Sequence, residues 1–203
     1  MYVVYWCRVN AFQDTLYAHS GRQFYREFYI TGWFISGNAA AVFQFCQIEA
    51  RKPLVGQSNM ITAQKREDNH QKLGFSIHKC NVMATLDLTP LKGMVKTYMG
   101  RPWDVLLRVV FMESFLDDLI DSAGWFPWND DKALLSTLFY GENENKGPGA
   151  DTKNRVNWEG FNIITDPNEE AKFTVGTLLS RVEWLKLHMF HMKNFSYLCN
   201  VVN

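Results

Sequence analysis

Hydrophobic and polar positions alternate along this chain in short phrases rather than with the period of a helix. One phrase occurs three times around a cysteine, as VYWCRVNA (4–11), FQFCQIEA (43–50) and IHKCNVMA (77–84). In each copy an apolar residue stands three positions before the cysteine, Val or Ile two after it, and Ala four after it. Alternation of this kind predicts short β-strands.

Two weaker copies extend the repeat, with Phe28 at the cysteine position in YREFYITG (25–32) and Ser114 there in FMESFLDD (111–118). The connections are rich in Gly, Asn, Asp and Ser. Strands that recur with one position kept in register predict a parallel β-helix, in which each coil buries its inner face against the next. A β-sandwich with strands of similar composition is the alternative. The coil from Cys7 to Phe28 has 21 residues, whereas the next, to Cys46, has only 18.

Charge and composition exclude several classes of function. The 21 basic residues balance 21 acidic ones, so no polybasic surface indicates nucleic acid or an anionic membrane, and a neutral ligand fits better. No apolar run approaches the roughly 18 to 20 residues of a membrane-spanning helix. The first residues, MYVVYWCRVN, lack the pattern of a secretory signal peptide, so the sequence predicts either an intracellular protein or one whose beginning lies outside this chain.

The other local signals are few. The four cysteines form no C-x-x-C pair, which argues against a zinc ribbon or a thioredoxin-type site and leaves structural or free thiols. Helical signals come late: Asp166 followed by Pro167 is typical of a capped helix start.

Six longer motifs identify a family. They are FQDTLYAHSGRQFYREFYITG (12–32), GNAAAVFQFC (37–46), ARKPLVGQSNMITAQKRED (50–68), TYMGRPW (97–103), DDLIDSAGWFPWN (117–129) and YGENENKGPGADTKNRVNWEGFNIITDPNEEAKFTVG (140–176). In this order they closely resemble plant pectinesterases, also called pectin methylesterases. The resemblance runs from about residue 4 to residue 185. It divides the chain into a partial pectinesterase domain, 1–185, and a tail without counterpart, 186–203.

The resemblance implies a fold and an activity. The fold is an all-β, right-handed, single-stranded parallel β-helix. The activity is hydrolysis of the methyl esters of homogalacturonan to free carboxylates and methanol in the cell wall, without a metal or organic cofactor. The implied partners are pectin and a pectinesterase inhibitor protein, with a monomer as the expected state and no nucleic acid or membrane. The family's location is extracellular.

Three residues match catalytic positions of the family. Asp14 matches the general acid/base, Gln13 the donor to the tetrahedral oxyanion, and Arg101 the arginine that holds the nucleophile. Ester hydrolysis in two steps needs a carboxylate nucleophile, a second carboxyl that moves the proton, and a donor where negative charge develops. As lone residues, Asp14 could be a turn carboxylate and Arg101 a structural ion pair.

Three aromatic residues match positions that contact the sugar rings. They are Tyr17 in Q-D-T-L-Y, Trp103 in G-R-P-W and Trp125 in A-G-W. For the two tryptophans, packing in the core or in a loop is the structural alternative.

The catalytic nucleophile has no counterpart in this chain. The family pattern I-T-G-T-V-D-F-I-F-G-N-A corresponds here to I-T-G-W-F-I-S-G-N-A, so Trp33 replaces three residues that include the nucleophilic aspartate, and Ser36 replaces an aromatic. This shortening agrees with the 18-residue coil, and within a strand it could shift the register and turn inward side chains outward. Glu27 and the aspartates 117, 118 and 121 are expected to be solvated and not to replace the nucleophile.

The resemblance also bears on the cysteines and on the ends. Cys46 and Cys80 match a pair that is disulfide-bonded in many relatives; a buried ladder of free cysteines is the alternative. Further coils precede the corresponding position in the family, so the first coil here is expected to have an unpaired edge unless something caps it. Three hypotheses remain: an incompletely represented pectinesterase, a non-catalytic protein that binds pectin or an inhibitor, and an unstable product without function.

Overall fold

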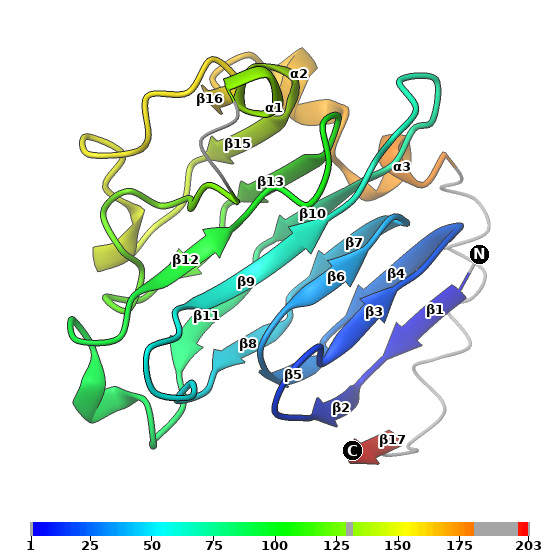
Figure 1. Ribbon diagram of the computed structural model, residues 1–203. Coiled ribbons are helices and arrows are strands. Elements are labelled where there is room, and N and C mark those ends of the chain that lie inside the picture. The colour runs from blue at the N-terminus through cyan, green and yellow to red at the C-terminus, as the bar shows by residue number, and fades with distance from the viewer. Residues whose placement is uncertain (1, 129–131, 181–198, 203) are drawn as a thin grey trace.

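A computed structural model describes residues 2–128, 132–180 and 199–202 of the chain. Its parallel strands form three sheets (Figure 1). Sheet A contains, in spatial order, β1 (Tyr2–Tyr5), β4 (Arg22–Arg26), β7 (Ala40–Gln44), β10 (Gly74–His78), β13 (Arg108–Met112), β15 (Phe139–Asn143) and β16 (Phe161–Ile163). Sheet B contains β14 (Phe115–Leu116), β11 (Asn81–Ala84), β8 (Gln47–Ala50), β5 (Tyr29–Gly32), β2 (Cys7–Asn10) and β17 (Cys199–Val202). Sheet C contains β12 (Thr97–Gly100), β9 (Asn59–Gln64), β6 (Ile35–Gly37) and β3 (Leu16–Ala18).

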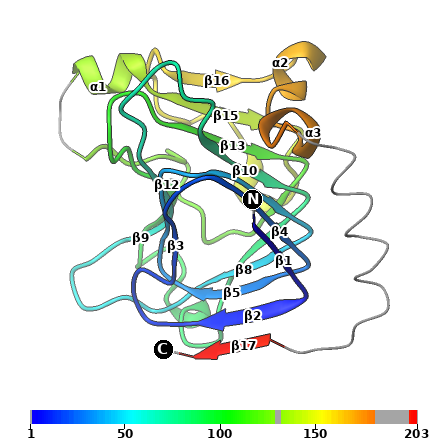
Figure 2. The same cartoon turned by 90° about the vertical axis from the view of Figure 1, so that its right-hand side faces the viewer.

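The chain visits the sheets in the repeating order A, B, C and thereby winds into coils. Figure 2, which views the stack from one end, shows the sheets as three sides around a common interior. Each strand pairs in parallel with the equivalent strand of the next coil, as β4 does with β7 and β7 with β10. The predicted parallel β-helix is therefore confirmed, and the alternative of a β-sandwich is wrong.

A single residue in the left-handed conformation turns the chain from sheet A to sheet B in each coil. These turn residues are Trp6, Glu27, Phe45, Lys79, Glu113 and Glu144, with φ between 46° and 55°. None of them is a glycine, so each turn carries a local strain that the surrounding ladder must offset. Their amides are used by the stack: for example, the Lys79 N–H donates to the Met112 carbonyl of the next coil at 2.9 Å.

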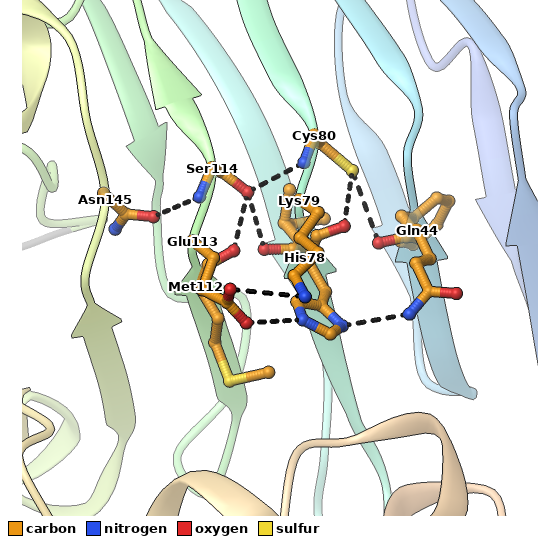
Figure 3. A network of polar contacts seen from close by, with 10 residues as sticks. Gln44, His78, Lys79, Cys80, Met112, Glu113, Ser114 and Asn145 are labelled. Atoms are coloured by element: carbon orange, nitrogen blue, oxygen red, sulfur yellow. Dashed lines mark hydrogen bonds and ion pairs between the residues drawn. The ribbon is translucent and has the colours of Figure 1, made fainter.

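The residue after each turn points inward and forms the column that the repeat predicted. The Cys46 N–H donates to Cys80 Sγ at 3.4 Å. In the same way the Cys80 N–H donates to Ser114 Oγ and the Ser114 N–H to Asn145 Oδ1, each at 3.0 Å (Figure 3). Each inward side chain thus satisfies a backbone donor that the turn leaves without a strand partner. This role favours Cys, Ser and Asn at the position.

The disulfide suggested for Cys46 and Cys80 is not present in the structure, where both are buried free thiols. Each thiol donates to the preceding coil instead, Cys46 to the Tyr25 carbonyl at 3.5 Å and Cys80 to the Phe43 carbonyl at 3.3 Å. Burial raises the pKa of the Cys80 thiol well above its ordinary value. The structure therefore has the buried cysteine ladder rather than the bridge.

The shortened coil keeps its register, contrary to the expectation of a slip. Strand β6 pairs with β3 on one side and with β9 on the other, and Ile35 remains inward with 1% of its surface exposed. Trp33 closes the coil, because its ring is buried next to Phe12 and its indole N–H donates to the Arg51 carbonyl at 3.2 Å. A large apolar side chain thus fills space at the corner where the coil is short.

The first two of the three described helices lie at the β16 end of the stack, whereas the third lies against β7 of sheet A (Figure 1). They are α1 (Lys132–Thr137), α2 (Pro167–Ala171) and α3 (Val175–Leu178), and two short 3-10 turns, η1 (Thr89–Leu91) and η2 (Pro148–Ala150), lie in connections. The predicted cap of α2 is confirmed, since the Asp166 side chain accepts from the Asn168 N–H at 2.9 Å. Leu178 and Leu179 pack on Phe24 and Val42 of sheet A.

At the opposite end of the stack, β17 pairs with β2 in parallel, with Cys199 level with Cys7. Of the predicted tail, 186–203, the structure describes residues 199–202, and the others lie outside the described residues. Within the described part of the chain, no helix combines the length and apolarity needed to cross a membrane.

Candidate active site

A cavity of about 500 Å³ lies over the outer face of sheet C. Successive side chains of a strand point to opposite faces, so the inward Leu16 and Ala18 leave Tyr17 directed outward. Tyr17 is in register with Ser36 of β6, and Ser36 with Ala63 of β9. These three line the cavity together with Gln13, Asp14, Phe34, Arg101, Trp103 and Trp128. Five of the six predicted site residues therefore meet in one place.

Gln13 and Asp14 occupy the turn that enters β3. Asp14 adopts a left-handed conformation with φ of 47°, and the following amide, that of Thr15, donates to the Trp33 carbonyl at 2.9 Å. Both side chains are exposed at the rim of the cavity. In the described part of the chain, Asp14 is the sole acidic residue among those that line the cavity. The second carboxylate of a two-step esterase is missing from this set.

Arg101 follows directly after β12, and aromatic rings hold its guanidinium group. The guanidinium carbon lies 3.9 Å from the ring centre of Trp128 and 5.1 Å from that of Phe34. Burial lowers the pKa of Arg101 below its ordinary value, and the negative charge of Asp14 acts in the opposite direction. Stacking between aromatic faces fixes the plane of the guanidinium group without using its N–H donors.

Trp125 does not contact the cavity, so its predicted role in sugar binding is wrong. Its side chain is 1% exposed and stacks on Tyr140 with ring centres 3.8 Å apart. The ring lies under the strand that ends at Arg101: a Cβ on Gly100 would come within 3.2 Å of it and within 2.4 Å of Thr62 Oγ1. Trp125 is a core residue that supports Gly100 from inside, which is the structural alternative named for it above.

The aromatic set of the cavity differs in part from the predicted one. Tyr17 and Trp103 are 52% and 39% exposed, with ring centres 6.3 Å apart across the opening. Phe34 and Trp128 also line the cavity, and the sequence analysis assigned neither. Ser36, noted above as the replacement for an aromatic, lies in the same lining. The signal for Trp128 was present in the motif GWFPWN, where two tryptophans stand three positions apart and only one belongs to the core.

The other carboxylates that could replace a nucleophile are engaged elsewhere. Lys92 Nζ and Lys96 Nζ lie 2.5 and 2.6 Å from carboxylate oxygens of Asp117 and Asp121, respectively. Burial would raise the pKa of each aspartate, but the hydrogen bonds from these lysines outweigh it and lower the pKa. The expectation that these acids are solvated is therefore wrong for Asp117 and Asp121, whose side chains are 19% and 12% exposed.

Asp118 and Glu27, the other two acids that were expected to be solvated, are more exposed than Asp117 and Asp121. Asp118 has 57% of its side chain exposed. Glu27 lies at the corner between sheets A and B, where the Tyr5 hydroxyl donates to it at 3.1 Å. Neither of them lines the cavity.

Comparisons with known proteins place this geometry in a family. The family model described as Pectinesterase matches residues 1–182. The chain is 57% identical over 182 residues to pectinesterase/pectinesterase inhibitor 18 of Arabidopsis thaliana, covering 89% of this chain and 32% of the relative. It is 55% identical over 187 residues to pectinesterase 3 of Solanum lycopersicum, covering 91% of this chain and 34% of the relative. The chain thus spans about a third of the length of these relatives.

Solved structures agree with the sequence matches. The pectin methylesterase from carrot is similar with a TM-score of 0.87 and 44% identity, over 96% of this chain and 60% of that one. The deglycosylated pectin methylesterase from Aspergillus niger gives a TM-score of 0.72 and 30% identity, over 89% of this chain and 54% of that one. The family model matches most of this chain, and the solved pectin methylesterases share its coiled architecture. This chain belongs to the pectinesterase family.

Proposed function

We propose that this chain binds methyl-esterified homogalacturonan in the cavity on sheet C and hydrolyses its methyl esters far more slowly than a site with two carboxylates. The substrate class follows from membership in the pectinesterase family. The slow rate follows from one observation: Asp14 is the sole acidic residue that lines the cavity in the described part of the chain. A covalent route needs a second carboxylate as the nucleophile.

The residues that remain can support direct attack by water. Asp14 acts as a general base and removes a proton from a water molecule as its oxygen attacks the ester carbonyl carbon. Gln13 and Arg101 supply N–H donors for the tetrahedral oxyanion. Collapse of the intermediate breaks the bond to the methoxy oxygen, and Asp14 returns the proton to it, so that methanol and the free carboxylic acid leave. The acid then loses a proton to solvent.

Aromatic residues position the sugar chain in this proposal. Tyr17 and Trp103 offer exposed ring faces on either side of the opening, and such faces stack on the apolar face of a pyranose ring. Binding by these rings does not depend on the missing carboxylate. A protein that binds pectin or a pectinesterase inhibitor protein without turnover is thus the second candidate, and the two candidates differ in whether methanol is released. An extracellular location and a monomeric state belong to the same proposal.

Methanol release from highly esterified pectin tests the proposal. We expect a rate more than about tenfold below that of a complete plant pectinesterase, because loss of a nucleophile in another hydrolase costs far more than that. We expect Asp14→Asn to lower the remaining rate by a further factor of about 100 or more. Asp118→Asn, which removes an exposed carboxylate outside the cavity, serves as the matched control and should not change the rate.

Each outcome decides between the candidates. A wild-type rate within about tenfold of the complete enzyme refutes slow turnover. A residual rate that Asp14→Asn leaves unchanged refutes the role of Asp14. Binding of pectin without detectable methanol supports the non-catalytic candidate, and absence of both binding and methanol refutes the proposed function altogether.

A further inference from the structure

Among the described residues, the guanidinium group of Arg101 forms no ion pair with a carboxylate at contact distance. In the part of the chain that the structure describes, no carboxylate lies within 4.0 Å of it, and its buried Nε–H has no hydrogen-bond acceptor. Leaving a buried charged donor unpaired costs free energy that a hydrogen-bonded anion would recover. The group faces the cavity, because Arg101 is among its lining residues.

Arg155 and Arg66 differ from Arg101, because hydrogen bonds within the fold satisfy their guanidinium donors. Arg155 donates from Nε and Nη2 to the two oxygens of Glu142 at 2.8 and 3.1 Å. Arg66 donates to backbone carbonyls of Asp68, Asn69 and Leu106 at 2.6 to 3.1 Å. The fold therefore satisfies these two arginines internally, whereas Arg101 has aromatic faces and an open cavity beside it.

The surroundings of Arg101 define the ligand chemistry. The rings of Phe34 and Trp128 lie against the guanidinium group, and its terminal nitrogens Nη1 and Nη2 donate no hydrogen bond to any described residue. Two parallel N–H donors at the edge of a guanidinium match the two oxygens of a carboxylate. Asp14 lines the same cavity and opposes a second negative charge, but its carboxylate is exposed at the rim, where water screens it.

We infer that this cavity binds the free carboxylate of a galacturonate residue in preference to the corresponding methyl ester. This inference rests on the proposed function for its sugar and adds the charge state of the preferred ligand. A methyl ester carries no net charge, and its methylated oxygen is a poor acceptor, so it cannot form the bidentate ion pair with Arg101. Tyr17 and Trp103 bind either form through the ring.

The preference has a consequence for turnover. The free carboxylate is the product of ester hydrolysis, so the residue just hydrolysed would be held by Arg101 and would compete with the next ester. The chain would therefore act mainly as a receptor for de-esterified segments of pectin, and its slow esterase activity would be inhibited by product.

Titration with two defined oligosaccharides tests the inference. Hexagalacturonate as the free acid and the same hexamer fully methyl-esterified are titrated into the whole chain at pH 7, with tryptophan fluorescence and calorimetry as readouts. We expect the free acid to bind at least about tenfold more tightly, the effect of a charged hydrogen-bonded pair. Arg101→Gln should remove this difference, mainly by weakening the binding of the free acid. Arg101→Lys, which keeps the charge but not the bidentate geometry, should give an intermediate ratio.

A matched control separates the site from general attraction of an anion. Arg8 also lies over an aromatic ring, that of Tyr29 at 5.0 Å, but it belongs to sheet B and not to the cavity. Arg8→Gln changes the net charge by the same amount and should keep the preference for the acid. If Arg8→Gln reduces the preference as much as Arg101→Gln does, the inference is wrong.

The remaining outcomes separate the inference from the proposed function. Equal affinity for both hexamers, or tighter binding of the ester, overturns the preference and leaves pectin binding intact. Absence of binding by either hexamer overturns both. A Tm of Arg101→Gln close to that of the unsubstituted chain shows that the variant is folded, so loss of acid binding then reports on the guanidinium group.

Discussion

Two tryptophans that sequence alone treats alike should respond in opposite ways to substitution. Trp125 is 1% exposed and stacked on Tyr140, whereas Trp103 is 39% exposed at the opening of the cavity. Trp125→Ala should therefore lower the stability of the fold, and Trp103→Ala should lower the affinity for pectin. Measuring both variants tests whether Trp125 belongs to the core and Trp103 to the cavity.

The magnitude follows from burial. Truncation of a fully buried Trp to Ala typically costs about 3 to 5 kcal/mol, and the stacked ring of Tyr140 would lose its partner. For a domain of this size each kcal/mol lowers Tm by roughly 2 to 4 °C, so Trp125→Ala should lower Tm by about 6 to 20 °C. Trp103→Ala exposes no core and should change the free energy of unfolding by less than about 1 kcal/mol.

A conservative variant keeps the test usable if Trp125→Ala does not fold. The indole Nε1–H of Trp125 is buried and has no hydrogen-bond acceptor among the described residues. Trp125→Phe removes this unpaired donor together with part of the stacked area, and the two effects partly cancel, so we expect a loss of about 2 kcal/mol or less. Differential scanning calorimetry measures Tm, and fluorescence titration with pectin measures affinity. The reasoning is refuted if Trp125→Phe or Trp125→Ala weakens pectin binding without lowering Tm, because the ring would then contact the ligand.

Two further predictions concern charge pairs. Burial would raise the pKa of Glu113, but hydrogen bonds from His78 and Lys79 outweigh it and lower the pKa below its ordinary 4.5 (Figure 3). The stability of the chain relative to Glu113→Gln should therefore be greatest well above pH 4.5, and this advantage should disappear as the pH falls through the lowered pKa. A stability difference that does not shrink in acid would contradict the pairing. The Arg155–Glu142 pair has side chains only 2% and 3% exposed, so Glu142→Gln, which leaves a buried cation unpaired, should cost about 3 to 5 kcal/mol by urea unfolding. The exposed pair of Glu169 with Lys172 is the control for which Glu169→Gln should cost less than about 1 kcal/mol, and equal costs would contradict the argument from burial.

The fold was predictable because one backbone requirement recurs in three successive coils. A left-handed turn leaves an amide that the next inward side chain accepts, so Cys46, Cys80 and Ser114 mark the coils in the sequence. That signal is local and needs no long-range information. The disulfide was not predictable in the same way, because stacked cysteines satisfy the repeat equally well as thiols that donate to carbonyls of the preceding coil.

The site was predictable only in part. Gln13, Asp14 and Arg101 lie in motifs whose order fixes their position on sheet C. The aromatic residues were harder to assign, because a tryptophan near the cavity can point outward like Trp103 or inward like Trp125, and a single bend in a loop decides between these directions. The alternation of side chains along a strand predicts their direction, but Trp103, in the segment after β12, and Trp125, in the segment after β14, lie outside any strand.

The shortened coil keeps the stack intact beside a cavity with a single carboxylate among its described lining residues. The resemblance to the family places three residues, one of them the nucleophilic aspartate, where this chain has Trp33. The adjacent strand β6 nevertheless pairs on both sides, because the buried indole fills the corner and donates to the Arg51 carbonyl. In our proposal, the covalent route lacks a second carboxylate, and de-esterified pectin would bring a carboxylate to Arg101. Slow hydrolysis and product binding would then have one common cause, so a chain in which the missing family residues are restored at Trp33 should gain activity and lose its preference for the free acid together.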